Sequence, residues 1–256
     1  MQVDGVSMRL CTTTIQRVML PAALLLLGFL SACAAPTPAP PPPEEIIAKA
    51  AERMKAVGSF RFAIDRDGAF AYLNPERTLA FARAEGDYVA PDQAQAKIRV
   101  IAPGIVAEVQ MASRGERYWE TDFINGEWQE LPSGSGFNPA SLFDPQGGFQ
   151  DILRQDVRDL KLEGVEELDD LPGQPLYALS GALDGGRLYD LTYGLIGPAE
   201  SRLHLWILPE TYELLRILID EPLPAGEIGE DGETSTRWQI DFWDFDQLDE
   251  IPVPGN

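Results

Sequence analysis

Few side chains in this sequence are of the types that carry out catalysis. The 256 residues include one histidine, His204, and two cysteines, Cys11 and Cys33. A zinc site needs three or four such ligands, so a single histidine cannot build one of the usual kind. A Ser-His-Asp triad would have to use His204, but no G-x-S-x-G motif precedes a helix, and residues 134–136 (GSG) lie in a predicted loop. Nucleotide-binding glycine motifs are absent from the sequence as well. The sequence therefore predicts a protein that is not an enzyme, with no cofactor and no metal.

Carboxylates are the abundant reactive groups: 41 acidic residues face 20 basic ones, for a net charge of −21. Pairs occur at residues 166–167, at residues 169–170, and at Asp244 with Asp246. Glycosidases need two carboxyl groups inside one cleft. In a chain with this many acidic residues, however, neighbouring carboxylates occur by chance. We therefore interpret these pairs as part of a solvated acidic face. Residues 229–233 (GEDGE) lack the spacing of a calcium loop. So acidic a body repels phosphate backbones, which excludes nucleic acid as a partner.

Cys33 stands where a covalent modification would be made. Basic residues precede an apolar run from Val18 to Leu30, which is too short to span a bilayer and reads as a signal peptide over residues 1–32. The run ends in Leu-Ser-Ala-Cys, which resembles a bacterial lipobox, whose cysteine becomes an acylated N-terminus. Residues 33–43 then form a lipidated cysteine and a proline-rich spacer, about 30 Å long if it is extended. We therefore expect a protein anchored by lipid to the outer face of the cell membrane.

The elements that would position a site follow this spacer, and residues 44–256 read as one domain. An apolar stripe with helical spacing predicts a helix over residues 44–57, ended by Gly58. Alternating patterns and turn signals then predict an antiparallel meander from residue 59 to residue 131. Short helices are predicted at residues 140–143, where Asn138 would be the N-cap, at 148–155 and at 184–193. Strands resume between and after these helices, ending in a strand over residues 234–245. No βαβ alternation occurs, so the fold class is α+β without a parallel doubly wound sheet.

This order of parts resembles the LppX, LprA, LprF and LprG type of mycobacterial lipoprotein. The resemblance covers residues 46–246 and rests on four segments rather than on long identities. They are W-x-x-L at residues 128–131, NPASLFDPQGGFQDIL at residues 138–153, G-x-E-x-L-D at residues 164–169, and Leu-Trp-Ile at residues 205–207.

The resemblance implies a LolA/LolB-like lipid-carrier fold. It implies a strongly curved antiparallel half-barrel, with short helices plugging its concave face and an apolar cavity that holds acyl chains of lipids or glycolipids. The helix over residues 149–153 would be a candidate lid. This chain departs from the family in being far more acidic and in lacking an obvious Lys or Arg cluster at a cavity mouth, which argues against an anionic headgroup.

Alternate strand residues and the apolar residues of the short helices are the candidates for lining such a cavity. The candidates are Phe60, Phe62, Ile64, Phe70, Tyr72, Phe81, Ile105, Val109, Met111, Trp119, Leu142, Phe143, Phe149, Ile152, Leu153, Leu205, Ile207, Leu215 and Ile217.

The same pattern also fits a filled core, because protein interiors are close-packed. In that case the domain would be an envelope scaffold or sensor that binds an unknown protein partner through its acidic surface. The aromatic residues of the last strand, Trp238, Phe242, Trp243 and Phe245, offer another contact surface if one face of that strand is outward.

Overall fold

The fold is that of a computed structural model, which describes residues 39–122, 125–132, 137–223, 228–229, 232–252 and 254. The unit that carries the sheet spans Pro41–Asn256. Nearly all of the other unit, Met1–Pro40, lies outside the described residues. The predicted signal peptide and Cys33 therefore lie outside them as well.

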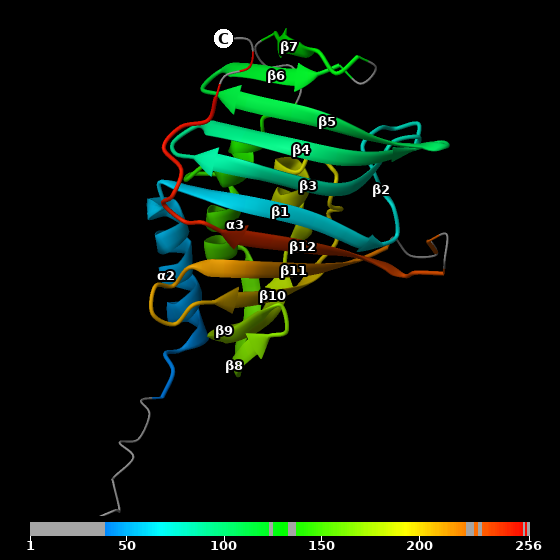
Figure 1. The fold of residues 1–256 in the computed structure, drawn as a ribbon. Helices are drawn as coiled ribbons and strands as arrows, with labels where there is room; N and C mark the ends of the chain where they lie inside the picture. Colours follow the sequence, from blue (N-terminus) through cyan, green and yellow to red (C-terminus); the bar gives the residue numbers. More distant parts are fainter. Residues whose placement is uncertain are drawn as a thin grey trace, which may run out of the picture. The chain divides into compact units, whose positions relative to one another are not determined.

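The secondary structure alternates between strands and short helices (Figure 1). In chain order the elements are α2 (Pro43–Ala56), β1 (Ser59–Gly68), β2 (Ala71–Tyr72), β3 (Ala80–Val89), β4 (Gln93–Ala102), β5 (Ile105–Arg114), β6 (Arg117–Thr121), β7 (Trp128–Leu131), the 3-10 helix η1 (Pro139–Phe143), α3 (Phe149–Gln155), β8 (Val157–Leu168), β9 (Leu171–Leu183), α4 (Gly185–Leu191), β10 (Ser201–Ile207), β11 (Leu214–Pro222) and β12 (Ser235–Trp243).

The strands form one antiparallel sheet in the order β7-β6-β5-β4-β3-β1-β12-β11-β10-β9-β8, with β2 paired to β3 beside this path. Each half is a meander, as the turn signals predict. The last strand, β12, lies at the centre of the sheet, where Ile64 of β1 pairs with Ile240. This long-range pairing joins the two meanders into one sheet.

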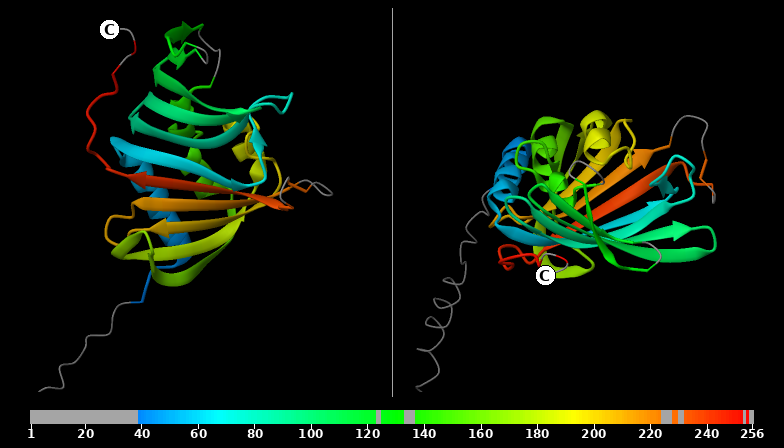
Figure 2. Two further views of the ribbon diagram at one scale, coloured as in Figure 1. Left: turned by 45° about the vertical axis from the view of Figure 1, so that its right-hand side comes forward. Right: turned by 90° about the horizontal axis from the view of Figure 1, so that it is seen from above.

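The helices α2, α3 and α4 lie on the same side of this sheet (Figure 2), so the prediction of an α+β fold with helices on one face is confirmed. The strong curvature of a half-barrel is not confirmed: the sheet is open and not strongly curled. Neighbouring strands of an open sheet rotate relative to one another. A sheet of this width can therefore hold helices against one face by twist, without curling around them.

Local sequence signals account for the helix boundaries. Pro43 stands in the first turn of α2, where a missing N–H costs nothing, and the face formed by Ile46, Ala50 and Met54 is buried. The Asn138 side chain accepts a hydrogen bond from the backbone N–H of Ala140 at 2.9 Å, so the predicted N-cap of η1 is confirmed.

The main apolar core lies between the sheet and the helices, and aromatic rings occupy its centre. The Phe60 ring lies 4.9 Å from Phe143 and 5.4 Å from Phe242, edge to face in both contacts. Trp238 and Phe242 are buried there, so these two aromatic residues of the last strand offer no contact surface. Only Trp243 of β12 is well exposed among these residues, because its odd position faces away from the helices.

A smaller apolar cluster lies on the helix-free face and contains Leu176, Ala178, Trp206 and Leu215. The Trp206 indole N–H donates to Glu166 Oε1 at 2.6 Å. His204 lies beside Trp206 in the same strand, with ring centroids 6.2 Å apart. The single histidine is therefore part of this outer cluster and not of the main core.

Candidate ligand-binding cavity

A cavity of about 510 Å³ lies between the sheet and the short helices. Its walls come from β1, β3, β4, β5 and β12 on one side and from η1, α3 and the segment after α4 on the other. The lining residues are Phe62, Ile64, Tyr72, Leu73, Leu79, Phe81, Ala84, Ala96, Ile98, Val100, Val109, Met111, Glu120, Phe137, Pro139, Leu142, Phe143, Phe149, Thr192, Tyr193, Leu195, Ile196, Trp238 and Ile240.

The pairing register explains how five strands present one apolar wall. Ile240, Ile64, Ala84, Ile98 and Val109 are successive partners across β12, β1, β3, β4 and β5, and all of them line the cavity. Residues directly opposite one another in antiparallel strands point to the same face. The wall is therefore a continuous row of side chains across the sheet.

Small residues at the centre of the sheet leave this space open. In the next row Phe62 pairs with Gly86, Gly86 with Ala96, and Ala96 with Met111. A Cβ atom on Gly86 would come within 2.6 Å of the Phe62 ring. The Phe62 ring therefore occupies the space above Gly86. Ala84 and Ala96 border the cavity, and these two small residues stand where larger side chains would fill the interior.

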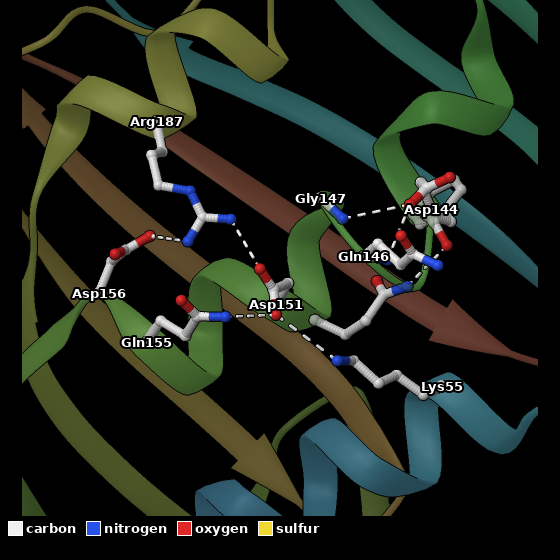
Figure 3. Close-up of polar contacts among 10 residues, drawn as sticks. Lys55, Asp144, Gln146, Gly147, Asp151, Gln155, Asp156 and Arg187 are labelled. Atoms are coloured by element: carbon white, nitrogen blue, oxygen red, sulfur yellow. Dashed lines mark hydrogen bonds and ion pairs between the residues drawn. The ribbon is translucent and has the colours of Figure 1, made fainter.

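On the helix side, η1 and α3 contribute Leu142, Phe143 and Phe149 to the wall. The turn between them is fixed by Asp144, whose Oδ1 accepts from the N–H groups of Gln146 at 2.7 Å and Gly147 at 3.1 Å (Figure 3). The Gln150 side chain then donates to the Phe143 carbonyl at 2.6 Å. These bonds hold the two short helices as one unit against the sheet.

Asp151 ties this unit to the neighbouring helices (Figure 3). Its carboxylate accepts from Arg187 of α4 at 2.7 Å and from Gln155 at 2.7 Å, and lies 3.5 Å from the Lys55 ammonium of α2. Arg187 also contacts Asp156 at 2.9 Å. The hydrogen bond from Arg187 holds the pKa of Asp151 below its ordinary value. The contacts link α2, α3 and α4 at the back of the cavity wall.

The cavity opens to solvent where Leu73 and Tyr193 line it, since these residues are 44% and 69% exposed. Beside them, the Arg77 guanidinium stacks on the Tyr72 ring at 4.7 Å. None of the described lining residues is Lys or Arg, and Glu120 on β6 is the charged group among them. The wall is thus almost wholly apolar, with one carboxylate.

Nine of the nineteen residues predicted to line a cavity border this one. They are Phe62, Ile64, Tyr72, Phe81, Val109, Met111, Leu142, Phe143 and Phe149.

The other ten cavity candidates lie elsewhere. Six are buried in the packed part of the main core, namely Phe60, Ile152, Leu153, Leu205, Ile207 and Ile217. Phe70 lies under the Arg66 guanidinium at 4.9 Å, and Ile105 is 53% exposed at the start of β5.

Trp119 and Leu215 are on the opposite face of the sheet. Trp119 pairs with Ala112, whereas its neighbour Glu120 pairs with the inward Met111. A bulge between Trp206 and Ile207 shifts the register beside Leu215.

Sequence reasoning missed Trp238 and Ile240, because their contact with β1 depends on a pairing between the two ends of the chain. Ala84 and Ala96 were not predicted either, since small residues make few contacts with a ligand. The alternation in the strand indicates that Ala84 and Gly86 share one face, and this run of small residues is the signal that could have been used.

The carboxylate pairs form structural contacts outside the cavity. Arg216 binds Asp170 at 2.5 Å, and Asp246 accepts from the Gly58 N–H at 2.6 Å. Part of residues 229–233 and all of residues 133–136 lie outside the described residues. Among the residues that are described, no cluster of three or more His, Cys, Asp or Glu side chains is arranged to hold a metal.

None of the helices in the described ranges is both long enough and apolar enough to cross a membrane.

Comparison with known proteins places this geometry in context. The model of the LppX_LprAFG lipoprotein family matches residues 42–246. Curated protein sequences give no match. The solved structure of LprF from Mycobacterium bovis aligns at a TM-score of 0.61 with 16% identity, covering 83% of this chain and 97% of that one. Lipoprotein LppX from Mycobacterium tuberculosis aligns at 0.55 with 18% identity, covering 82% and 97%. A LolA superfamily protein from Nitrosomonas europaea covers 83% and 96% with 13% identity, at a TM-score of 0.27 that supports no conclusion.

Proposed function

Because the chain belongs to the LppX_LprAFG lipoprotein family, we propose that it is a membrane-anchored lipoprotein that binds and ferries the acyl chains of a lipid or glycolipid. The apolar cavity of about 510 Å³ carries this proposal. Pockets for small ligands have volumes of roughly 300–1,000 Å³ and mostly apolar walls. The protein has no catalytic role in this proposal.

A filled scaffold would bury its aromatic residues against one another and leave no such space. In this protein the rings pack tightly around Phe60, while the small residues Ala84 and Ala96 border the open region beside them. Water would not be stabilised in an apolar cavity of this size, because a buried water molecule needs polar hydrogen-bond partners. Burial of acyl methylenes in the cavity would favour binding by about 0.8 kcal/mol for each CH₂ removed from water.

In this proposal residues 1–32 are removed as a signal peptide, and Cys33 carries the acyl anchor. Residues 33–43 then tether a lipid-binding domain, residues 44–256, outside the cytoplasmic membrane. One acyl chain holds a protein only marginally on a bilayer, so two or more would be needed for a firm anchor.

The headgroup that fits the described wall is uncharged. Glu120 opposes a carboxylate or phosphate brought into the cavity, and no Lys or Arg lines the wall to pair with one. A hydroxyl headgroup can donate to the Glu120 carboxylate at no such cost.

A series of monoacylglycerols with increasing chain length tests the proposal. Each added methylene is expected to lower the Kd by about fourfold until the cavity is full, after which the Kd should stop changing. The Kd is measured by displacement of a fluorescent acyl probe. A Kd that does not depend on chain length, or failure of every probe to bind, would refute acyl binding in the cavity.

A further inference from the structure

A second hollow, of about 360 Å³, lies on the helix-free face of the sheet, which is turned toward the viewer in Figure 1. Trp243 of β12 and Trp128 of β7 both line it, and each is 38% exposed. The other three tryptophans, Trp119, Trp206 and Trp238, are at most 8% exposed. Both exposed indoles of the protein therefore border one groove.

One wall of the groove is a row of polar side chains across the strands. Trp243 pairs with Arg61, Arg61 with Asp87, and Asp87 with Gln95. The Gln95 amide donates to Asp87 Oδ2 at 2.6 Å, and Arg61 lies 3.4 Å from Asp87 Oδ1. Donors and acceptors thus alternate along this wall.

The other wall is the outward row two residues along each strand. Glu85 pairs with Lys97, and Lys97 with Gln110. The intervening row contains Gly86 and Ala96, which point to the helix side, so the floor of the groove is backbone. In the described part of the chain, the exposed Gln110 side chain has no hydrogen-bond partner.

The groove runs across the strands from β12 to β7, which are six strand spacings apart. At about 4.8 Å per spacing its ends are at most about 29 Å apart. A peptide that adds to a sheet as a further strand needs a free edge and runs along the strands. This groove instead crosses the strands, so its shape favours an extended ligand that binds through side chains.

The charges of the groove balance, although the protein has 41 acidic and 20 basic residues. Its lining contains two basic residues, Arg61 and Lys97, and two acidic ones, Glu85 and Asp87. Arg61 contacts Asp87 on one wall, and Lys97 contacts Glu108 beside the other. A charged ligand would have to separate these contacts, and the net charge of −21 repels a polyanion such as a single-stranded nucleic acid. Hydroxyl groups both donate and accept, so an uncharged polyol can bind among these groups without displacing a charge.

We propose that this groove is a binding site for a linear, uncharged oligosaccharide. The indoles of Trp128 and Trp243 would cover the C–H faces of sugar rings at its two ends, since an indole offers a large apolar face. Arg61, Asp87, Gln95 and Lys97 would bond the hydroxyl groups between them. The site is on the opposite face of the sheet from the lipid cavity and does not depend on the proposed lipid function.

Tryptophan fluorescence of the full-length protein, in a detergent without a sugar headgroup, tests this proposal. The probes are maltohexaose, cellohexaose and an α-1,6-linked mannohexaose, none of which carries an acyl chain. We expect at least one of them to change the emission saturably. Trp128→Ala and Trp243→Ala should each raise its Kd at least tenfold, as followed by calorimetry. Trp243→Phe should restore most of the affinity, because a phenyl ring keeps a stacking face.

Tyr189→Ala is the matched control, because Tyr189 is 43% exposed but lies outside the groove. Its Kd should equal that of the unaltered protein. The proposal is overturned if no uncharged hexasaccharide binds, if binding survives both tryptophan-to-alanine changes, or if an oligogalacturonate of equal length binds as tightly. It is also overturned if only an acylated form of the sugar binds, since that result would assign the binding to the lipid cavity.

Discussion

Two small residues leave room in the interior at the residue scale. Ala84 and Ala96 line the cavity in two neighbouring rows of side chains that face the helices, and Ala96 pairs with the larger Met111. A larger side chain at either position would reduce the space. In the proposed function, the capacity for acyl chains would therefore depend on the small size of these two residues.

Val109→Trp is expected to block the cavity, because Val109 lines it on β5 and is only half-buried. The indole can enter the open space, so stability should change by less than about 1 kcal/mol while the Kd for a monoacylglycerol rises at least tenfold. Ile105→Trp is the matched control, since it adds a similar mass on the same strand and face but outside the cavity. Equal loss of binding in both variants would contradict the assignment of the cavity.

Glu120→Gln tests the preference for an uncharged headgroup. The change removes the carboxylate charge from the wall while keeping the size of the side chain and one hydrogen-bond acceptor. We expect the Kd for a fatty acid to fall several-fold and the Kd for the monoacylglycerol of equal chain length to change little. A variant that binds both ligands as the unaltered protein does would show that the headgroup lies away from Glu120.

At the scale of elements, the short helices depend on contacts with their neighbours, including polar ones, because they are too short to be stable alone. Helices of this size are marginal alone, and α3 has seven residues. Asp151 connects it to Arg187 of α4 and to Lys55 of α2. A movement of α3 away from α2 and α4 would have to break these contacts.

The Asp151 contacts predict a pH-dependent stability. The pKa of Asp151 is lower in the folded protein than the ordinary 3.8, chiefly because of Arg187. A carboxylate of this kind stabilises the fold above its unfolded-state pKa, and this contribution is lost as the pH falls through the lower folded-state pKa. Asp151→Asn should cost about 1–2 kcal/mol at neutral pH. The difference in unfolding free energy from the unaltered protein should close in acid, as followed by urea unfolding.

Gln155→Ala provides a graded comparison for this prediction, because it removes one hydrogen bond that also lowers the pKa of Asp151. Its cost should fall in acid too, but by less than that of Asp151→Asn, since Arg187 makes the larger contribution to the pKa. A cost of Asp151→Asn that stays constant with pH would show that the carboxylate charge contributes nothing to the contact.

Most elements could be predicted from the sequence because their signals are local. Proline at the start of α2, the Asn138 cap and the alternation in the strands all act within a few residues. The faces of some strands were misassigned for the same reason. Trp119 looks inward from its own alternation, but pairing between Glu120 and Met111 turns it to the helix-free face. Register is a property of two strands, and one strand alone does not determine it.

At the scale of the whole molecule, the pairing of β1 with β12 joins the two halves of the sheet and brings Trp238 and Ile240 to the cavity. Strands so far apart in sequence give no local signal of their contact, so the part of the cavity wall that β12 supplies could not be predicted from the sequence. The expected strong curvature came from the family resemblance, and it is the feature of the fold that is not confirmed.

Native mass spectrometry of the unit from Pro41 onward, expressed in a lipid-rich host, tests the lipid-carrier account most directly. The account predicts a discrete mass adduct that disappears on organic extraction, that appears in the extract as an acylated lipid, and that is absent from Val109→Trp. A clean protein mass that also fails to take up fluorescent acyl probes would contradict it, and would favour a scaffold that acts through its acidic surface.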